Sequence, residues 1–521
     1  MIYFFLCGII VRRNGDKMNL VLTYLEKTCE KNKNKVAVIY KDEKITYEKL
    51  VENAKKVGTK LSSVVDNNDP VIVFMNKGID ALEAFFGVLY AGGCYSLINP
   101  EFPDVRIEQI KGVLNNKIVI TNDEFINRAK EVFSDIEILN INDLLNANID
   151  EEVLSNVRDN KMDIDPVYIN FTSGSTGVPK GVMVSNRSIV DFINKFTDVF
   201  NITSEDIMAN QAPFDFDVSV KDIYSAFFKG ATLLIVPKEY FSKPAELLDY
   251  VCLNKATVMV WAVSALCLIT TFHGLDYKVP TDVKKIIFSG EVMPIKHLKK
   301  WMEKLPDTMF VNAYGPTEIT CNCTYHIIDR NREYEEYIPI GKSFKNEKVF
   351  LLDENNNLIT EPNKVGEICV SGSCLSLGYF NNWDQTNAHF IQNPLNNKYF
   401  ERIYLTGDLG RYDENNDLVF SGRKDFQIKY MGHRIELEEI DRAIMKVDGI
   451  IRTCTIFDED KNRLYGFYIG DIDSKELKIT LQKELPIYMI PTVLVKYDEF
   501  PITKNGKIDR KELMRMYKEN K

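Results

Sequence analysis

The chain has 521 residues, of which 45% are hydrophobic and 27% charged, and its formal net charge is −10. This composition is typical of a globular protein, and the length predicts two or more domains. The acidic balance gives no basic surface for nucleic acid or an anionic membrane. The ten cysteines lack zinc-ribbon spacing, so we expect reduced thiols and a cytoplasmic protein.

The N-terminal segment is almost entirely apolar up to Val11 and is followed by Arg12 and Arg13. It is too short to span a bilayer and has no basic region ahead of its apolar run, as a signal peptide would. We therefore expect residues 1–17 to be a disordered or non-native extension, with a short membrane-associating segment as the alternative. No membrane span is expected.

From Met18 onward, helical and strand patterns alternate along the chain. Helical spacing at 20–29, 47–61 and 80–91 is separated by short apolar runs at 36–40, 45–47, 70–74, 117–121 and 136–139. A further helix is expected from Ser188 to Phe200. Strands that alternate with helices predict parallel sheets with helices packed on their faces, which is an α/β fold.

One stretch, Thr172 to Gly181, combines three glycines, four hydroxyl residues and a lysine within ten positions. Glycines let a backbone turn its N–H groups inward, hydroxyls add donors, and Lys180 adds a positive charge, which suits a polyphosphate. It is not a Walker loop, because no hydroxyl residue follows the lysine. A flexible Gly/Ser linker is the alternative, but apolar strands flank the stretch on both sides.

This loop resembles the phosphate loop of the adenylate-forming superfamily, which includes acyl-CoA synthetases, luciferases and the adenylation domains of nonribosomal peptide synthetases. The resemblance extends over nearly the whole chain from Met18, with the motifs in the expected order. It implies ATP and Mg²⁺ as cofactors. The loop residues expected at ATP are Thr172, Ser173, Gly174, Ser175, Thr176, Gly177 and Lys180.

The resemblance also implies the domain organisation. A large N-terminal adenylation core would span 18–424 and contain αβ-layered subdomains and a β-rich subdomain. A small mobile α+β domain would span 425–521 and swivel about Asp425, where the charge density of the sequence rises.

A second motif, Asn312 to Glu318, ends a predicted strand in Tyr-Gly-Pro-Thr-Glu. Parallel sheets bind ligands at the carboxyl ends of their strands, an aromatic ring there can stack on a base, and a carboxylate can hold Mg²⁺. By resemblance, Asn312, Ala313 and Tyr314 belong at adenine, Thr317 at phosphate and Glu318 at the metal. The same resemblance places Asp408 at the ribose and Arg423 at the nucleotide. As an alternative, Glu318 and Asp408 could each be an ordinary acidic residue of a turn.

The segment Phe216-Asp217-Val218-Ser219-Val220 places a carboxylate between apolar residues. Asp217 could simply cap the helix that follows it. Peptide-synthetase adenylation domains have a similar Phe-Asp-x-Ser-Val, in which the aspartate binds the α-amino group of the substrate, so the resemblance favours an amino acid over a fatty acid.

The remaining substrate positions follow by alignment outward from the motifs. They are Asp217, Val218, Lys221, Ser264, Ile287, Ser289, Ala313, Cys321 and Asn322. Lys221 is unusual there, because a buried ammonium needs a partner. A carboxylate on the substrate side chain would supply this partner. Alternatively, the Lys221 side chain points to solvent and needs none. One departure from the family is Asn186, where many relatives have histidine.

The C-terminal Lys507 lies on an Asn-Gly turn and matches the catalytic lysine of the family. The resemblance thus implies a stand-alone amino-acid ligase that forms an aminoacyl-adenylate and passes it in trans to the phosphopantetheine thiol of a carrier protein. Catalysis would involve Lys507, Thr317 and Glu318. A D-alanine–carrier-protein ligase of cell-wall modification and an acyl-CoA or aryl-acid ligase are the alternatives, and a non-catalytic nucleotide-binding scaffold is a more remote one.

Overall fold

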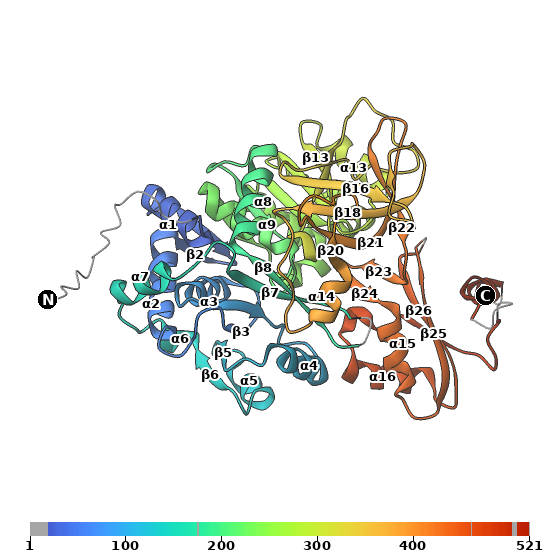
Figure 1. The fold of residues 1–521 in the computed structure, drawn as a ribbon, viewed down its shortest axis with the longest axis horizontal. Coiled ribbons are helices and arrows are strands. Elements are labelled where there is room, and N and C mark those ends of the chain that lie inside the picture. The colour runs from blue at the N-terminus through green and yellow to red at the C-terminus, as the bar shows by residue number, and fades with distance from the viewer. Residues whose placement is uncertain (1–18, 175–176, 460, 503–507, 520–521) are drawn as a thin grey trace, which may run out of the picture.

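The computed structural model describes residues 19–174, 177–459, 461–502 and 508–519. Ser175, Thr176 and Lys507 therefore lie outside the described residues. The remaining chain forms two large sheets with helices between and around them, a smaller sheet beside them, and a lobe at the C-terminal end (Figure 1). The expected α/β fold is confirmed.

The largest sheet has nine strands, and its central strands are parallel, whereas β2, β14 and β15 at its edges are antiparallel. In spatial order the strands are β15 (Lys342–Ser343), β14 (Thr324–Ile327), β13 (Met309–Tyr314), β12 (Lys285–Ser289), β11 (Val258–Ala262), β9 (Ile207–Asn210), β10 (Thr232–Ile235), β1 (Val36–Tyr40) and β2 (Glu43–Thr46). Ser289 and Tyr314 end neighbouring parallel strands, so this edge brings expected substrate and nucleotide residues together.

The second sheet has seven strands and carries the phosphate-loop stretch between β7 and β8, which pair antiparallel. Its order is β19 (Gly378–Tyr379), β8 (Lys180–Ser185), β7 (Pro166–Thr172), β4 (Cys94–Leu97), β3 (Pro70–Phe74), β5 (Ile118–Thr121) and β6 (Glu137–Asn140).

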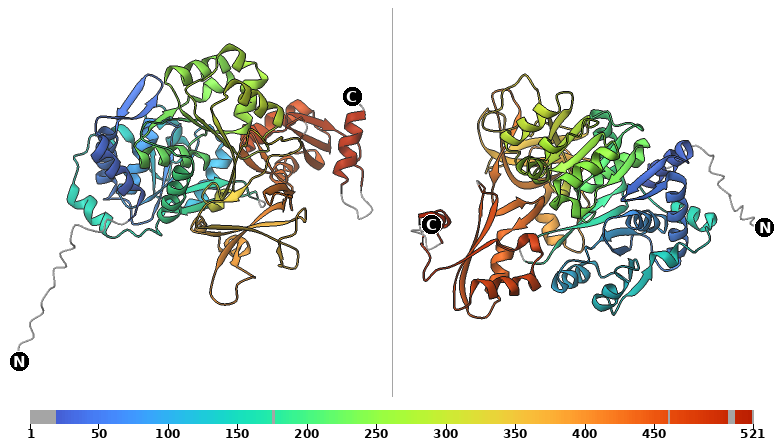
Figure 2. Two further views of the ribbon diagram at one scale, coloured as in Figure 1. Left: turned by 90° about the horizontal axis from the view of Figure 1, so that it is seen from above. Right: turned by 180° about the vertical axis from the view of Figure 1, so that it is seen from behind.

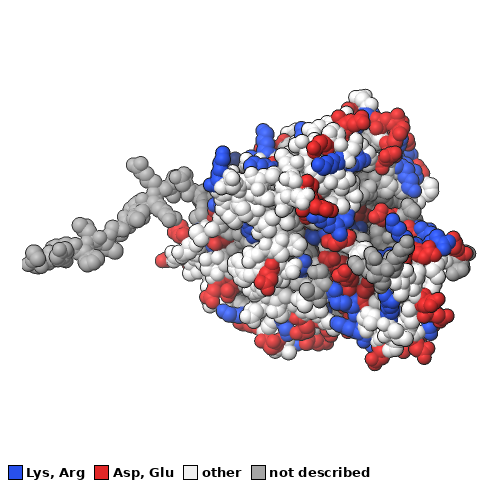
Figure 3. All heavy atoms as spheres, turned by 45° about the vertical axis from the view of Figure 1, so that its right-hand side comes forward, with Lys and Arg blue, Asp and Glu red and all other residues white. Residues whose placement is uncertain are grey.

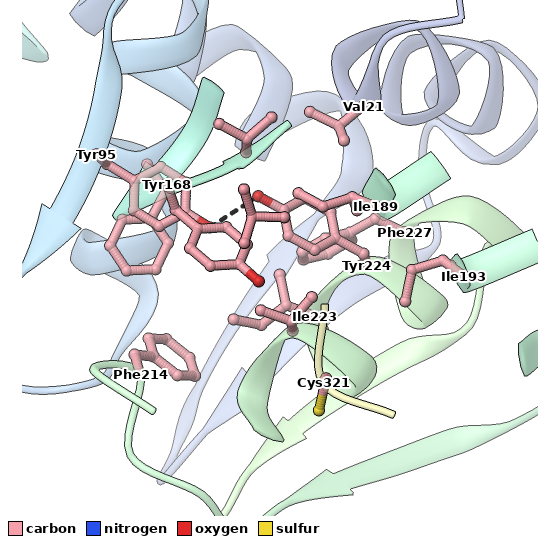
Figure 4. Packing of buried hydrophobic residues seen from close by; sticks show 14 of the residues in the cluster. Val21, Tyr95, Tyr168, Ile189, Ile193, Phe214, Ile223, Tyr224, Phe227 and Cys321 are labelled. Atoms are coloured by element: carbon pink, nitrogen blue, oxygen red, sulfur yellow. Dashed lines mark hydrogen bonds between the residues drawn. The ribbon is translucent and has the colours of Figure 1, made fainter. Parts of the chain in front are cut away.

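Helices between the two sheets form the largest apolar core together with the inner faces of both sheets. These helices are α1 (Val21–Asn32), α2 (Tyr47–Leu61), α3 (Ile79–Tyr90), α8 (Asn186–Val199) and α9 (Val218–Lys229). Tyr95 of β4 and Tyr224 of α9 join the layers through a 2.8 Å hydrogen bond between their hydroxyls (Figure 4). The buried hydroxyls thereby satisfy one another inside an apolar core.

Other helices cover the outer faces of the sheets. The nine-stranded sheet packs on α10 (Pro244–Leu253), α11 (Val263–Thr271), α12 (Gly274–Tyr277) and α13 (Ile295–Lys304), and the seven-stranded sheet on α4 (Asp104–Leu114) and α5 (Ile126–Val132). Short helices α6 (Ile141–Leu144) and α7 (Glu151–Asp159) connect β6 to β7. None of the helices in the described ranges is both long enough and apolar enough to cross a membrane.

Several sequence-based boundaries agree closely with the structure, and one differs for a clear reason. The helix at 47–61 and the strand at 70–74 have the expected bounds. The helix expected from Ser188 begins at Asn186, because the Ser185 side chain caps it by accepting a hydrogen bond from the Ser188 amide. Asn186 is buried and accepts a hydrogen bond from the Val21 amide at 3.1 Å, so it anchors the start of α1.

The β-rich section expected after Gly366 forms a third, antiparallel sheet. It contains β17 (Leu358–Ile359), β16 (Glu347–Leu352), β18 (Gly366–Gly372), β21 (Arg402–Tyr412) and β20 (Phe390–Gln392), with β22 (Leu418–Arg423) paired to β21 and α14 (Trp383–His389) nearby.

We call residues 427–519 the C-terminal lobe. It contains β23 (Gln427–Tyr430), β24 (His433–Glu436), α15 (Leu437–Met445), β25 (Ile450–Asp458), β26 (Arg463–Gly470), α16 (Ser474–Glu484), β27 (Val493–Lys496) and α17 (Arg510–Glu519). Its apolar residues form two cores separate from the larger ones. In Figure 1, β23 and β24 lie toward the rest of the molecule, and the red helix α17 lies at the far end, beside the C-terminal marker, where Figure 2 also shows it. Acidic and basic side chains are interspersed on the face shown in Figure 3.

Candidate active site

The described part of the phosphate-loop stretch closes a hairpin in which Thr172 of β7 pairs with Lys180 of β8. Gly177 has φ +85°, and a Cβ on Gly174 would lie 2.0 Å from the Val178 carbonyl oxygen, so both positions require glycine. The Lys180 ammonium lies 5.4 Å from the centre of the Tyr379 ring. Burial lowers the pKa of Lys180, and no carboxylate among the described residues forms an ion pair with it. The loop thus offers a partly buried cation.

Glu318 follows the same edge of the nine-stranded sheet, in the short 3₁₀ helix η2 (Thr317–Ile319). Its side chain is only 1% exposed. The Tyr379 hydroxyl donates to it at 2.7 Å, and one nitrogen of the Arg434 guanidinium lies 2.9 and 3.0 Å from its two oxygens. Burial opposes ionisation, but Arg434 and Tyr379 outweigh it and lower the pKa of Glu318 to about 2. The site therefore holds an ionised carboxylate at neutral pH.

A third group of residues joins the sheets at the expected nucleotide position. The Tyr314 hydroxyl donates to Oδ2 of Asp408 at 2.6 Å, and the Arg423 guanidinium donates to Oδ1 of the same carboxylate. Arg423 also donates to Asp425 from Nε and Nη2, at 2.6 and 2.8 Å. Lys429 of the C-terminal lobe lies 5.4 Å from the centre of the Tyr314 ring. The Asn312 amide donates to the Pro339 carbonyl at 2.9 Å.

Asp217 lies at the start of α9 and is 7% exposed, yet its side chain makes no capping hydrogen bond. A simple helix-cap role is therefore wrong. Thr317 donates a hydrogen bond to Asp217, and burial raises the pKa of Asp217 despite this bond and the nearby Lys221. The carboxylate thus lies near Glu318 in space although the two are far apart in sequence, and it lacks an ion-pair partner among the described residues.

Lys221 lies one turn further along α9 and is fully buried, so the alternative in which it points to solvent is wrong. Its ammonium donates to Ser289 Oγ at 3.0 Å and to Asn322 Oδ1 at 2.8 Å. The Cys321 thiol is also adjacent, and burial raises the pKa of that thiol to about 12. Cys321 appears below the inter-sheet helices in Figure 4, close to Ile223 of α9.

The other expected pocket residues divide into two groups. Val218, Ile287 and Ala313 are buried, and Ala313 pairs with Ser289 across β12 and β13. Ser264 instead donates a hydrogen bond to Glu291. Glu291 also accepts a hydrogen bond from the Gly432 amide at 2.6 Å, so Ser264 lies near the contact with the C-terminal lobe.

The C-terminal lobe contacts the phosphate-loop hairpin directly, which the sequence did not reveal. Ser173 Oγ donates to the Arg434 carbonyl at 2.7 Å, and Arg442 donates to the Gly174 carbonyl at 3.2 Å. Arg106 of α4 and Glu439 of α15 form a buried ion pair at 2.9 Å. Arg434 belongs to a Gly-His-Arg-Ile-Glu stretch whose charge the sequence shows, but its partner is 116 residues away.

His433 packs against Phe216 of the core and is not an exposed loop residue. It lies in β24 and stacks on Tyr488 with ring centres 3.6 Å apart, and burial lowers its pKa to about 4. A cavity of about 40 Å³ lies here, lined by Phe216 and Thr317 on one side and by His433, Arg434 and Tyr488 on the other. A larger groove of about 600 Å³ between β25 and α17 contains none of the expected site residues.

The family model for "AMP-binding enzyme" matches residues 25–380. The chain belongs to this family, and it is an ATP-dependent ligase that forms an acyl-adenylate, of the type represented by nonribosomal-peptide adenylation domains and D-alanine–carrier-protein ligases.

Among its relatives, zwittermicin A synthase ZmaJ of Bacillus cereus is 31% identical over 94% of this chain and 93% of the relative. A D-alanine–D-alanyl carrier protein ligase of Bacillus cytotoxicus is 30% identical over 95% of this chain and 99% of the relative. Bacitracin synthase 1 of Bacillus licheniformis is 32% identical, but the chain covers only 9% of that protein.

Solved structures show the same fold. The Vibrio cholerae adenylation domain AlmE in complex with glycyl-adenosine-5'-phosphate has a TM-score of 0.85 at 20% identity, over 98% of this chain and all of that one (100%). Holo-PA1221, with adenylation and PCP domains, has a TM-score of 0.83 at 22% identity, over 95% of this chain and 84% of that one.

Proposed function

We propose that the protein activates an amino acid as its aminoacyl-adenylate and then transfers the aminoacyl group in trans to the phosphopantetheine thiol of a carrier protein. The buried Asp217 is the observation that carries the amino-acid assignment. Its carboxylate has a hydrogen bond from Thr317 but no ion-pair partner among the described residues. A substrate α-ammonium would supply that partner, whereas a fatty acid would leave a buried acid uncompensated.

In the first half-reaction, a substrate carboxylate oxygen forms a bond to the α-phosphorus of ATP. The bond from that phosphorus to the bridging oxygen breaks, and pyrophosphate leaves. The protein's task is positioning and charge stabilisation. The hairpin from Thr172 to Lys180 would hold the leaving pyrophosphate, Asp408 and Arg423 the ribose side, and Asn312, Ala313 and Tyr314 the adenine.

Glu318 fits a Mg²⁺ ligand. It is a buried, ionised carboxylate, and its contact residue Arg434 also touches the phosphate-loop hairpin through Ser173. Mg²⁺ in such sites is held by one or two carboxylates together with phosphate oxygens. A site of this kind needs no cluster of three or more acidic, histidine or cysteine ligands, and the described residues contain no such cluster. The bound ion would neutralise charge on the phosphates.

In the second half-reaction, the carrier thiolate attacks the carbonyl carbon of the adenylate. The new C–S bond replaces the C–O bond to AMP, which leaves. The cavity lined by Thr317 and His433 lies between the core and the C-terminal lobe, where a thiol arm would have to enter. The lobe presents β23 and β24 to the site here, and α17 lies at its far end (Figure 1).

This arrangement supports a two-state scheme for the proposed domains, 18–424 and 425–521. Lys507 would bridge substrate and phosphate oxygens only after the lobe rotates about Asp425. Such rotation is a common way to complete a catalytic site.

Pyrophosphate exchange into ATP tests the proposal. Wild-type protein is incubated with a panel of amino acids, fatty acids and aryl acids. We expect exchange with at least one amino acid, and its loss in Lys507→Ala. Exchange supported only by a fatty or aryl acid would contradict the amino-acid assignment.

A second candidate is a D-alanine–carrier-protein ligase. The D-alanine–D-alanyl carrier protein ligase of Bacillus cytotoxicus, which this chain covers almost completely, favours it. Exchange that depends on D-alanine, and not on L-alanine, would distinguish it.

A further inference from the structure

Two opposite charges lie one helical turn apart on α9 and do not pair with each other. Asp217 and Lys221 are four residues apart, a spacing that brings side chains together on one face of a helix. Asp217 is 7% exposed and Lys221 is fully buried. Among the described residues, neither forms an ion pair, and both accept or donate hydrogen bonds with neutral side chains instead.

The Lys221 ammonium has neutral partners in the part of the chain that the structure describes. It donates to Ser289 Oγ at 3.0 Å and to Asn322 Oδ1 at 2.8 Å. The next acid along the helix, Asp222, bonds elsewhere: its Oδ2 accepts from the Asn210 amide at 2.8 Å, and burial raises its pKa to about 7. A buried ammonium without a paired carboxylate is costly, so a carboxylate on a ligand would supply the missing counter-charge.

A strained turn holds one of these partners against Lys221. Thr320 and Cys321 both have left-handed backbone conformations, with φ +56° and +83°, which are uncommon for residues other than glycine. Gly315 packs so closely against this turn that a Cβ on it would lie 2.6 Å from the Asn322 Cα. Backbone strain of this kind is retained only where the surrounding structure fixes it, and it clusters at ligand sites.

Tyr168 of β7 brings a second donor to the same place. Its side chain is fully buried, and its hydroxyl has no hydrogen-bond partner among the described residues. In Figure 4 this hydroxyl points toward Ile223, on the side where Cys321 lies. Burial raises the pKa of the Tyr168 phenol, and the neighbouring Asp217 raises it further, so the phenol keeps its proton. A buried hydroxyl without an acceptor is rare, and a ligand oxygen would satisfy it.

We propose that the substrate is an amino acid whose side chain ends in a carboxylate, which binds Lys221 and Tyr168 while the α-ammonium binds Asp217. This inference rests on the proposed function, because it takes Asp217 as the site of the α-amino group. Each unpaired charge of α9 then receives its partner from one ligand. A side-chain amide would leave the ammonium without a counter-charge, and an apolar side chain would offer the Tyr168 hydroxyl no acceptor.

Pyrophosphate exchange with matched acids and amides tests this inference. Aspartate, asparagine, glutamate, glutamine and 2-aminoadipate are each supplied in the L and the D form. We expect wild type to prefer one acid over its amide by roughly 30- to several-thousand-fold in kcat/KM, the range for a buried charge that gains or loses its partner. Lys221→Met should abolish this preference. Lys229→Met is the matched control at the other end of α9, where Lys229 pairs with the exposed Asp198, and it should keep the preference.

Tyr168→Phe separates a role in binding from a role in folding. Because the hydroxyl has no partner among the described residues, its removal should leave the midpoint of thermal unfolding unchanged. The kcat/KM for the preferred acid should nevertheless fall by about 10- to 150-fold, the effect of losing a hydrogen bond to a charged group. An unchanged kcat/KM in Tyr168→Phe would remove this residue from the substrate site.

Exchange with other amino acids but with none of the acids would overturn the inference and leave the amino-acid function standing. Exchange with no amino acid at all would overturn both. An amide used as well as its acid, or an acid preference that survives Lys221→Met, would also overturn the inference. Thermal unfolding of each variant verifies that it is folded, and the ratio of acid to amide in wild type decides the question without any variant.

Discussion

The Tyr314 hydroxyl lies 2.6 Å from Oδ2 of Asp408, although 94 residues separate the two in sequence. Tyr314 ends a strand of the nine-stranded sheet, and Asp408 lies in the antiparallel third sheet. This hydrogen bond therefore joins two parts of the molecule at the proposed nucleotide site. Arg423 supports the same carboxylate from its partner strand.

Tyr314→Phe should weaken both the nucleotide site and the fold. The change removes one hydrogen bond to a buried carboxylate, so we expect unfolding free energy to fall by about 1–3 kcal/mol. The KM for ATP in the exchange assay should rise, while the KM for the amino acid stays nearly constant. Tyr325→Phe is a matched control, since Tyr325 lies on the adjacent strand β14 outside the site. Equal KM values in wild type and Tyr314→Phe would contradict the nucleotide assignment.

Asp217→Asn should abolish most amino-acid activation. Removing a buried charge that pairs with a substrate ammonium typically costs 2–5 kcal/mol, so kcat/KM for the amino acid should fall by roughly 30- to several-thousand-fold. Binding of ATP should change little. Asp282→Asn, at an exposed acid, provides the comparison. An unaltered kcat/KM in Asp217→Asn would mean that the α-amino group binds elsewhere.

Lys221→Met should change which amino acid is preferred. The buried ammonium bonds to Ser289 and Asn322, so the apolar replacement leaves both acceptors unpaired. We expect a loss of about 1–3 kcal/mol in unfolding free energy and a shift of the exchange ranking toward apolar side chains. The KM for ATP should remain that of wild type. A ranking that stays the same would place Lys221 outside the substrate pocket.

The stability that Glu318 contributes should depend on pH. The pKa of this carboxyl falls from 4.5 to about 2 in the folded protein, chiefly because Arg434 overcomes the burial penalty. A lowered folded pKa gives stability that is complete above pH 4.5 and is lost as pH falls toward 2, on the order of 3 kcal/mol in total.

Urea unfolding of wild type and Glu318→Gln between pH 2 and pH 7 measures this contribution. The difference in unfolding free energy should be constant above about pH 5 and should shrink on acidification. A difference that does not vary with pH would show that Glu318 titrates alike in the folded and unfolded chains.

Breaking the buried ion pair of Arg106 and Glu439 should slow aminoacyl transfer, the second half-reaction, more than adenylate formation, the first. It connects α4 to α15 of the C-terminal lobe, with both side chains under 10% exposed. Arg106→Met leaves a buried carboxylate unpaired, which usually costs 3–5 kcal/mol. We expect aminoacyl transfer to a carrier thiol to slow at least tenfold, while pyrophosphate exchange is largely kept. If Arg106→Met reduced both activities to the same extent, the ion pair would not act only in this position of the lobe.

The fold class and the main motifs could be predicted because they depend on local sequence. Short continuous apolar runs define strands such as β3, and the glycines of the hairpin near Thr172 must be there for the backbone to turn. The start of α8 was misplaced by two residues, since capping by Ser185 depends on one side chain.

Contacts between distant segments were not predictable from local pattern. Nothing near Tyr379 indicates that its hydroxyl reaches Glu318, and the charges around Arg434 resemble those of an exposed hairpin. The stacking of His433 on Tyr488 likewise depends on how the lobe folds against the core. A single sequence gives residue types, but these pairings depend on the tertiary arrangement.

Detection of the aminoacyl-adenylate itself tests the central claim most directly. Wild-type protein and Asp217→Asn are incubated with ATP, Mg²⁺ and each amino acid of the panel, and the products are identified by mass spectrometry. We predict an aminoacyl-AMP from at least one amino acid with wild type and at least 30-fold less with Asp217→Asn. An adenylate formed from a fatty or aryl acid alone, or equally by both proteins, would contradict the account.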